Sequence, residues 1–144
     1  MTTTETLVLR RTYGAPRAAV FRAWTDVAEL ARWYSPSSEF GVQRAEGEIR
    51  AGGRAEFTFG PPGEEPYVET NRYREVVPAT RLVFQMTISR AGRVLSETVV
   101  TVEFRDLDGG TEVIVTDVGS GAEEHATGWG PTLDNLGRHL ARTG

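Results

Sequence analysis

The sequence of 144 residues contains no cysteine, which excludes disulfides, thiolate nucleophiles and zinc–thiolate sites. It has only two histidines, His125 and His139, 14 residues apart. Two isolated imidazoles without cysteine do not match the ligand sets of protein metal sites. No glycine-rich phosphate-binding motif occurs either. We therefore expect neither a metal nor another cofactor.

Positive charge is also scarce, with 16 basic against 20 acidic residues and a net charge of −4. Because no dense basic cluster is present, we expect no nucleic-acid partner and no anionic membrane surface as a partner. No run approaches the roughly 18 apolar residues of a membrane span, so we expect no membrane insertion. The first residues, MTTTETLVLRR, do not resemble a signal peptide. These features predict a cytoplasmic protein with a single domain over residues 1–144.

The first part of the chain predicts one strand and two short helices. Residues 5–13 (ETLVLRRTY) alternate like a strand. Pro16 suits the first turn of a helix that ends near Thr25. Asp26, with Glu29 three residues later, has the pattern of a helix N-cap with a capping-box partner. Pro36 ends this second helix.

From residue 41 onward the pattern is that of strands. Short turns such as Gly52-Gly53 separate consecutive runs, which predicts an antiparallel meander. Alternating side chains mark one inward face, for example Phe57 and Phe59, or Phe84 and Met86. The six predicted strands lie within residues 41–50, 52–60, 67–77, 80–89, 94–106 and 111–119.

A long amphipathic helix is predicted at the end of the chain. Ser120 and Glu123 form a second capping-box pattern, and Pro131 predicts a kink or a break near residue 130. This helix is the only element large enough to cover the aromatic face of the sheet. A curved sheet around one helix leaves a wedge in which a small-molecule cavity can form.

Five sequence segments resemble a known family. They are APRAAVFRAWTDVAELARWYSP, GEIRAGGRAEF, EVVPATRLVFQ, GGTEVIVTDVG and HATGW, the last followed by Leu133 and Leu136. In this order they resemble the START-like (SRPBCC) superfamily, and within it the branch similar to the activator of the heat-shock-protein-90 ATPase. Ser35 stands where this family usually has glycine. The resemblance implies an α+β helix-grip fold: a curved antiparallel sheet around a long C-terminal helix, with two short helices after the first strand.

The leading interpretation is a binding module that encloses a hydrophobic small molecule, such as a lipid, a polyketide or an aromatic metabolite. The resemblance leaves two alternatives: a cyclase, dehydratase or hydrolase using the same cavity, and a chaperone-associated interaction module. The residues predicted to line the cavity are Trp24, Trp33, Tyr34, Phe57, Phe59, Tyr73, Phe84, Met86, Val100, Val102, His125, Trp129 and Leu133.

For several side chains the sequence leaves two possible roles. Trp33 and Tyr34 either pack the core or border the entrance of the cavity. His125 is a structural histidine or an acid–base group, and the sequence identifies no partner for it. A serine–histidine–acid triad is not expected, because no GxSxG motif places a nucleophile. Five polar strand residues would line the cavity if their strand faces turn inward: Gln85, Glu69, Thr70, Glu97 and Asp117. Gln85 is then a candidate hydrogen-bonding group inside the cavity, whereas Glu69 and Glu97 are expected on solvated faces.

Overall fold

A computed structural model describes residues 4–37 and 39–143 of the chain. The ends of the predicted domain, residues 1–3 and 144, lie outside the described residues. The order of elements is that predicted from the sequence, with a short 3₁₀ helix, η1, added before the last helix. The elements are β1 (Glu5–Tyr13), α1 (Arg17–Thr25), α2 (Val27–Trp33), β2 (Val42–Gly47), β3 (Arg54–Phe59), β4 (Tyr67–Val77), β5 (Arg81–Arg90), β6 (Arg93–Leu107), β7 (Gly110–Gly119), η1 (Ala122–His125) and α3 (Ala126–Thr143).

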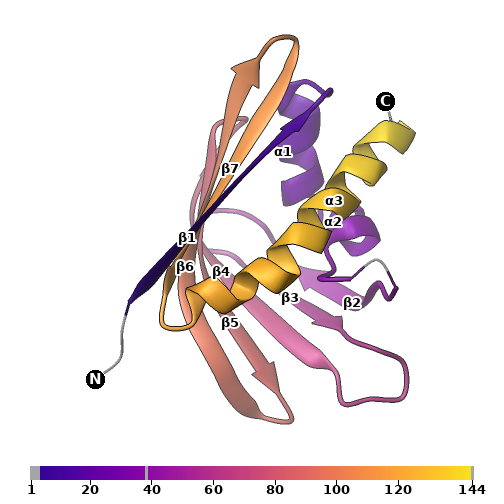
Figure 1. Cartoon of the computed structure of the whole chain (residues 1–144), viewed down its shortest axis with the longest axis vertical. Coiled ribbons are helices and arrows are strands. Elements are labelled where there is room, and N and C mark those ends of the chain that lie inside the picture. Colours follow the sequence, from indigo (N-terminus) through magenta and orange to yellow (C-terminus); the bar gives the residue numbers. More distant parts are fainter. Residues whose placement is uncertain (1–3, 38, 144) are drawn as a thin grey trace.

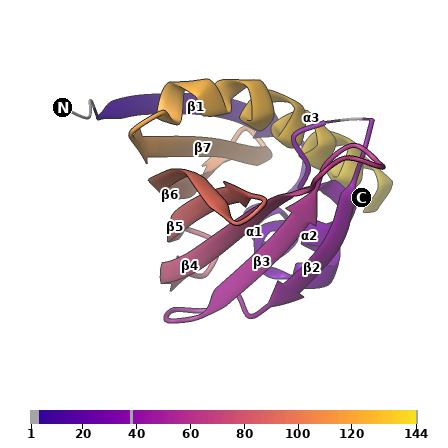
Figure 2. The same ribbon diagram turned by 90° about the horizontal axis from the view of Figure 1, so that it is seen from below.

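All seven strands form one antiparallel sheet in the order β1-β7-β6-β5-β4-β3-β2. Consecutive strands from β2 to β7 are neighbours, as the short turns predict, and β1 closes the far edge beside β7. The sheet curves, and α3 crosses its concave side (Figure 1). The view from below shows the strands as an arc (Figure 2). The helix α2 packs against β2, and α1 packs against β6 and β7. The helix-grip architecture is therefore confirmed.

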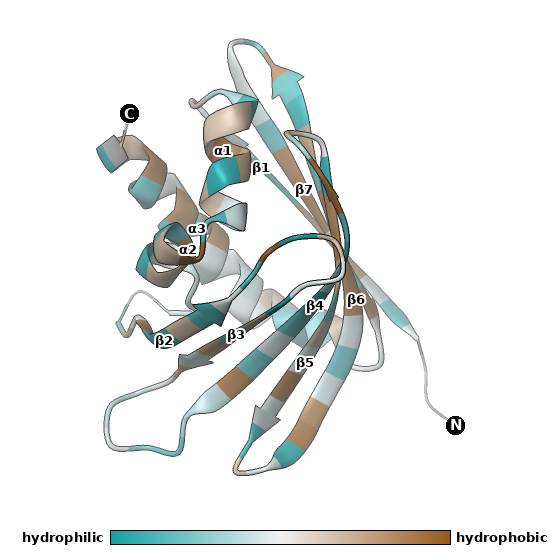
Figure 3. Cartoon of the chain, turned by 180° about the vertical axis from the view of Figure 1, so that it is seen from behind, coloured by the Kyte–Doolittle hydropathy of each residue, from teal (hydrophilic) through white to brown (hydrophobic). Residues whose placement is uncertain are grey.

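The inward faces of the strands follow the period of two. Hydropathy alternates along β4, β5 and β6 (Figure 3), and the buried positions alternate in the same way. Gln85 lies between the buried Phe84 and Met86 and is therefore on the outer face. The prediction that Gln85 contributes a hydrogen bond inside the cavity is wrong. Glu97 is exposed, as predicted.

The two short helices are fixed by a cap and by aromatic packing. The Asp26 carboxylate accepts hydrogen bonds from the backbone N–H groups of Ala28 and Glu29, which confirms the predicted N-cap. Trp33 is buried edge-on against Trp24, with ring centroids 4.9 Å apart, and donates its indole N–H to the carbonyl of Ala23. The two helices are thus held together by a tryptophan pair inside the core.

The start of the last helical segment differs from the prediction. The N-cap of η1 is Gly121 and not Ser120, so the predicted capping box of Ser120 and Glu123 is wrong; the Glu5 carboxylate accepts the backbone N–H of Glu123 instead. The helix α3 continues through Pro131, so the chain does not break there, and a kink at this position stays a prediction. Its apolar stripe packs on the core, with Leu133 and Leu136 fully buried.

Candidate functional site

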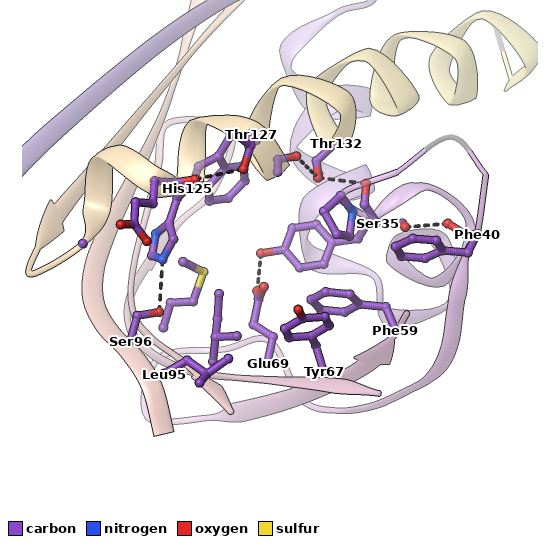
Figure 4. Close-up of a pocket in the computed structure, with 18 residues that line it drawn as sticks. Ser35, Phe40, Phe59, Tyr67, Glu69, Leu95, Ser96, His125, Thr127 and Thr132 are labelled. Carbon is purple, nitrogen blue, oxygen red and sulfur yellow. Dashed lines mark hydrogen bonds between the residues drawn. The ribbon is translucent and has the colours of Figure 1, made fainter. Parts of the chain in front are cut away.

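A cavity of about 480 Å³ lies between the sheet and the last helices. Its floor comes from β3 to β6, its roof from η1 and the first turns of α3, and one wall from the segment after α2 (Figure 4). The lining residues are Tyr34, Ser35, Pro36, Phe40, Phe59, Tyr67, Glu69, Met86, Ile88, Leu95, Ser96, Gly121, Glu124, His125, Thr127, Gly128, Trp129 and Thr132. A volume of this size is typical of small-molecule sites.

Only part of the predicted wall faces this space. Five of the predicted residues line it: Tyr34, Phe59, Met86, His125 and Trp129. The other eight are packed in the hydrophobic core: Trp24, Trp33, Phe57, Tyr73, Phe84, Val100, Val102 and Leu133. They lie on the inward face, as the alternation indicates, but neighbouring side chains fill the space around them. Trp33 and Tyr34 therefore have different roles: Trp33 packs in the core, and Tyr34 lines the cavity.

A β-bulge brings Leu95 to the cavity beside Ser96, which already lies on the inward face of β6. In the register of β5 with β6, Ile88 is opposite Ser96 and Ser89 is opposite Val94, so Leu95 is the extra residue. Regular alternation would place Leu95 and Ser96 on opposite faces. Bulges change the direction of side chains and are frequent beside active sites. Here the bulge allows both residues to line the cavity.

Ser96 begins a chain of hydrogen bonds through His125 to Asp117. The Ser96 Oγ lies 3.0 Å from Nε2 of His125, and Nδ1 of His125 lies 2.6 Å from Oδ2 of Asp117. The same carboxylate oxygen accepts the indole N–H of Trp129 at 3.0 Å. The Asp117 side chain is fully buried, and that of His125 is nearly so. This carboxylate is the acidic partner that the sequence did not identify.

The pKa of His125 is raised above its usual value by these surroundings. Burial alone lowers it, but the hydrogen bond and the charge of Asp117 raise it further than burial lowers it. Glu69 and Glu124 add smaller effects in the same direction. The imidazole is thus held in one orientation by Asp117 and gains a proton more readily than a free histidine.

A second polar cluster lies on the floor of the cavity. Tyr34 donates its phenolic hydrogen to Oε2 of Glu69, and Asn71 donates to the same oxygen at 2.9 Å. Burial raises the pKa of Glu69 and also that of Tyr34. Glu69 is only 6% exposed, so the expectation that it lies on a solvated face is wrong. The hydrogen bonds that Tyr34 and Asn71 donate to Glu69 offset part of the free-energy cost of burying its carboxyl group.

One end of the cavity is closed by contacts between α3 and the segment after α2. Thr132 Oγ1 and Asn135 Nδ2 both donate to the carbonyl of Ser35. The Ser35 hydroxyl donates to the carbonyl of Phe40, a bond that a glycine at this position could not make. Gly128 comes so close to Pro36 that a Cβ at position 128 would lie 3.2 Å from the proline ring. This wall is therefore held by specific hydrogen bonds.

The cavity carries acidic and neutral side chains. Glu69, Glu124 and His125 are its titratable groups apart from two tyrosines, and none of its described lining residues is lysine or arginine. Within the described residues, no group of three or more histidine, aspartate or glutamate side chains is arranged to hold a metal ion. None of the described helices has the length and hydropathy needed to cross a membrane.

Sequence reasoning did not single out Ser96 or pair Tyr34 with Glu69, and it considered Glu69 and Asp117 only as residues that would line the cavity if their strand faces turn inward. The strand alternation contained a usable signal for three of these residues. Glu69 shares the period of Tyr73 on β4, and Asp117 shares that of Val113 and Val115 on β7. Ser96 shares the period of the buried Thr98 and Val100 on β6.

Comparison with known proteins gives the same architecture. No curated protein matches the chain. A protein of Rhizobium leguminosarum shares 26% identity over 99% of this chain and 97% of its own, with a TM-score of 0.86. CalU16 from Micromonospora echinospora is 21% identical, with a TM-score of 0.68 over 95% of this chain and 76% of its own. DynU16, a protein in the dynemicin biosynthetic locus, is 18% identical, with a TM-score of 0.73 over 94% of this chain and 47% of its own. The latter two show the shared fold alone.

The match to a family model is more specific than these structural likenesses. Residues 14–141 match the model described as Activator of Hsp90 ATPase homolog 1-like protein. The matched range extends from the turn after β1 to the last turn of α3, so it includes both short helices and the whole cavity. The chain therefore belongs to the Activator of Hsp90 ATPase homolog 1-like family, on the START-like helix-grip fold.

Proposed function

We propose that the protein binds a small, largely apolar molecule in the cavity beneath η1 and α3. The observation that carries the proposal is the cavity of about 480 Å³, in which apolar side chains surround two separate polar groups. The aromatic floor, with Phe59 stacked on Tyr67 at 5.9 Å, offers a flat apolar surface. Burial of apolar ligand surface would supply most of the binding free energy, and the polar groups would orient the ligand.

The charges around the cavity favour an uncharged ligand. A carboxylate ligand would lie near Glu69 and Glu124, none of the described lining residues is lysine or arginine, and the imidazole of His125 is already paired with the Asp117 carboxylate. Neutral aromatic or polyketide-like molecules are therefore expected to bind more tightly than free fatty acids of similar size. A hydroxyl or carbonyl group on the ligand would meet either His125 or the carboxyl of Glu69.

A thermal-shift screen of neutral flavonoids, polyketides, dynemicin and fatty acids tests this function. A ligand of the native state raises Tm, and the rise grows with the logarithm of the ligand concentration relative to its Kd. The variant Ile88→Trp places a large side chain in the cavity and should abolish the shift. Val8→Trp makes the same kind of change at a half-exposed position on β1, outside the cavity lining, and should keep it.

The tryptophan indole signals in an NMR spectrum locate the bound ligand. Trp129 lines the cavity, whereas the Trp33 indole is bonded to Ala23 within the core. Binding in the cavity should therefore shift the Trp129 indole signal and leave that of Trp33 nearly unchanged. If no compound in the panel raises Tm, the binding function is wrong, and a protein partner such as a chaperone becomes the next candidate.

An enzymatic role in the same cavity is the second candidate. It is favoured by the ordered imidazole of His125, whose Nδ1 is bonded to a fully buried carboxylate. A histidine oriented in this way is typical of general acid–base groups. The turnover of bound ligands by the wild type, compared with His125→Gln, distinguishes a binding protein from an enzyme.

A further inference from the structure

The residues Ser96, His125 and Asp117 have the mutual arrangement of a nucleophile, a base and an orienting acid. The two linking distances, 3.0 Å and 2.6 Å, are within hydrogen-bond range. Asp117 accepts the proton of Nδ1, which leaves the lone pair of Nε2 directed at the Ser96 hydroxyl. The second bond to Asp117, from the Trp129 indole, holds the carboxylate in place.

We propose that Ser96 is an acyl-accepting nucleophile, activated by His125 and Asp117, and that the substrates are small, largely apolar esters. The proposal rests on the proposed function, because the ester must first enter the cavity. It assigns to that cavity a reaction class and a reacting atom, Ser96 Oγ. Such constellations occur on unrelated folds and are recognised by geometry rather than by a sequence motif.

The fold brings Ser96, His125 and Asp117 together without a nucleophile elbow. Ser96 lies near the beginning of β6, on the same inward face as Thr98 and Val100 and next to the bulge at Leu95. Asp117 comes from the adjacent strand β7, and His125 ends η1, which begins after Gly121. The backbone of Gly121 has φ of +81°, in the left-handed region that favours glycine. This turn directs the chain from β7 back over the cavity, where His125 contacts Ser96 of β6 (Figure 4) and Asp117 of β7.

The reaction proceeds in two balanced halves. Ser96 Oγ attacks the ester carbonyl carbon while its proton moves to Nε2 of His125. The bond to the alcohol oxygen breaks, and the leaving alcohol takes the proton from His125, which leaves an acyl group on Ser96. A water molecule then attacks this acyl group and gives its proton to His125. The carboxylic acid leaves, and the proton returns to Ser96.

The electrostatics of the cavity suit this sequence of steps. Asp117 from β7, Glu69 from β4 and Glu124 from η1 are the charged groups that act on His125, and all of them are acidic. Each stabilises the imidazolium that forms during attack on the ester. The acidic product carries a negative charge near Glu124, so its release is favoured over its retention.

The sheet also indicates where the rest of the substrate lies. Glu69, Ile88 and Ser96 are opposite one another on β4, β5 and β6 and form one row across the floor of the cavity. Two strand spacings separate Glu69 from Ser96, which is about 10 Å. An ester with a hydroxyl or carbonyl group at about this distance from its reacting carbon would contact both polar clusters.

Covalent labelling with p-nitrophenyl butyrate tests the proposal directly. The chain contains neither cysteine nor lysine, so few other side chains can retain the acyl group. We expect one butyryl adduct by intact-mass spectrometry, located on Ser96 by peptide mapping. Ser96→Ala should lose it, and Ser89→Ala, on the neighbouring strand and outside the cavity lining, should retain it. Asp117→Asn should slow acylation at least tenfold. An adduct that persists in Ser96→Ala, or none in the wild type, overturns the proposal.

A second variant tests activation without depending on ester chemistry. Ser96→Cys introduces the only thiol of the chain, and the pH dependence of its alkylation by iodoacetamide gives the thiol pKa. A neighbouring imidazolium lowers a thiol pKa. We expect half-maximal alkylation at least one pH unit lower for Ser96→Cys than for Ser89→Cys, and expect this difference to disappear with His125→Gln. Equal pH profiles overturn the activation of Ser96. Ligands that raise Tm without any acylation would leave the binding function intact while excluding this reaction.

Discussion

Tyr34 donates its phenolic hydrogen to the carboxyl of Glu69, so that two buried ionisable groups share one hydrogen bond at the floor of the cavity. The donor comes from the residue that ends α2, and the acceptor from the middle of β4. The contact therefore joins the short helices to the sheet as well as placing a polar group inside the cavity. Because burial raises the pKa of Glu69, its charged form is disfavoured in the folded protein.

We predict that Glu69→Gln makes the free energy of unfolding less sensitive to rising pH. The folded pKa of Glu69 is raised, so the associated stability is fully present below the unfolded value of 4.5 and is lost as pH rises through the folded pKa. Each unit of difference corresponds to about 1.4 kcal/mol. Urea unfolding from pH 4 to pH 8 should therefore show the variant gaining stability relative to the wild type. The exposed Glu97→Gln is the control and should show no such gain; parallel curves for Glu69→Gln and the wild type would contradict this prediction.

The next prediction concerns the link between Asp117 and His125. Asparagine at position 117 can still accept hydrogen bonds but carries no charge, so Asp117→Asn should lower the pKa of His125, as measured by NMR titration of the imidazole. His139, the other histidine of the chain, is bonded to Glu29 and serves as the internal reference. If the titration of His125 is the same in both proteins, Asp117 does not govern its charge.

The same link predicts a pH-dependent loss of stability. The folded pKa of His125 is raised above 6.5, so the stabilisation is present below the unfolded pKa and is lost as pH rises through the folded value. The groups that act on His125 are Asp117, Glu69 and Glu124. We expect Asp117→Asn to cost about 1 to 2 kcal/mol at pH 6 and less at pH 9. Unfolding in urea at both pH values measures the difference. A larger cost at pH 9 than at pH 6 would reverse the assigned sign.

Phe57 and Phe59 provide a comparison between the core and the cavity wall. Both are inward residues of β3, but Phe57 is fully buried, with its ring centroid 5.0 Å from that of Tyr34, whereas Phe59 lines the cavity. Phe57→Ala should cost about 3 to 5 kcal/mol, because it leaves a void inside packed side chains. Phe59→Ala removes atoms that already border open space and should cost about half as much. Denaturant unfolding of the two variants measures both values, and equal losses would mean that Phe59 is part of the core.

How much of the fold and of the cavity could be predicted from the sequence depends on which physical rule determines the position of each residue. Alternation places Phe57, Phe84 and Val100 on the inward face, and the short turns predict the order of the strands. The same rules cannot distinguish a core residue from a cavity residue. That distinction depends on how far α3 stands away from each strand, and it decided the roles of eight predicted wall residues.

The polar residues of the site were harder to predict for a different reason. A charged residue in a strand is usually solvated, so Glu69 is expected outside unless its partners are known. Those partners, Tyr34 and Asn71, become neighbours only through the tertiary structure. Alternation along β6 places Ser96 on the inward face with Thr98 and Val100, but it does not show that Ser96 meets His125. Recognising His125 as a helix neighbour of Trp129 was possible from spacing, whereas its bond to Asp117 was not.

The uninterrupted course of α3 through Pro131 leads to the last prediction. Proline has no N–H to donate to the carbonyl of Thr127, and a proline inside a helix costs about 3 kcal/mol relative to alanine. Pro131→Ala should restore this bond, although proline also restricts the unfolded chain by up to about 1 kcal/mol. We therefore expect a net gain of about 1 to 2 kcal/mol in the free energy of unfolding, measured by urea denaturation.

Gly130→Ala is the matched control for that measurement. A Cβ at position 130 would meet no atom within 4 Å, so its gain reports helix propensity alone, about 0.5 to 1 kcal/mol. A larger gain for Pro131→Ala than for Gly130→Ala identifies the missing hydrogen bond as the additional cost. Because Thr127 lines the cavity and its carbonyl lacks this partner, the restored bond would also tighten the roof. A stabilised Pro131→Ala variant with weaker ligand binding would then show that the proline keeps the roof of the cavity adaptable, whereas unchanged binding would limit its role to the helix itself.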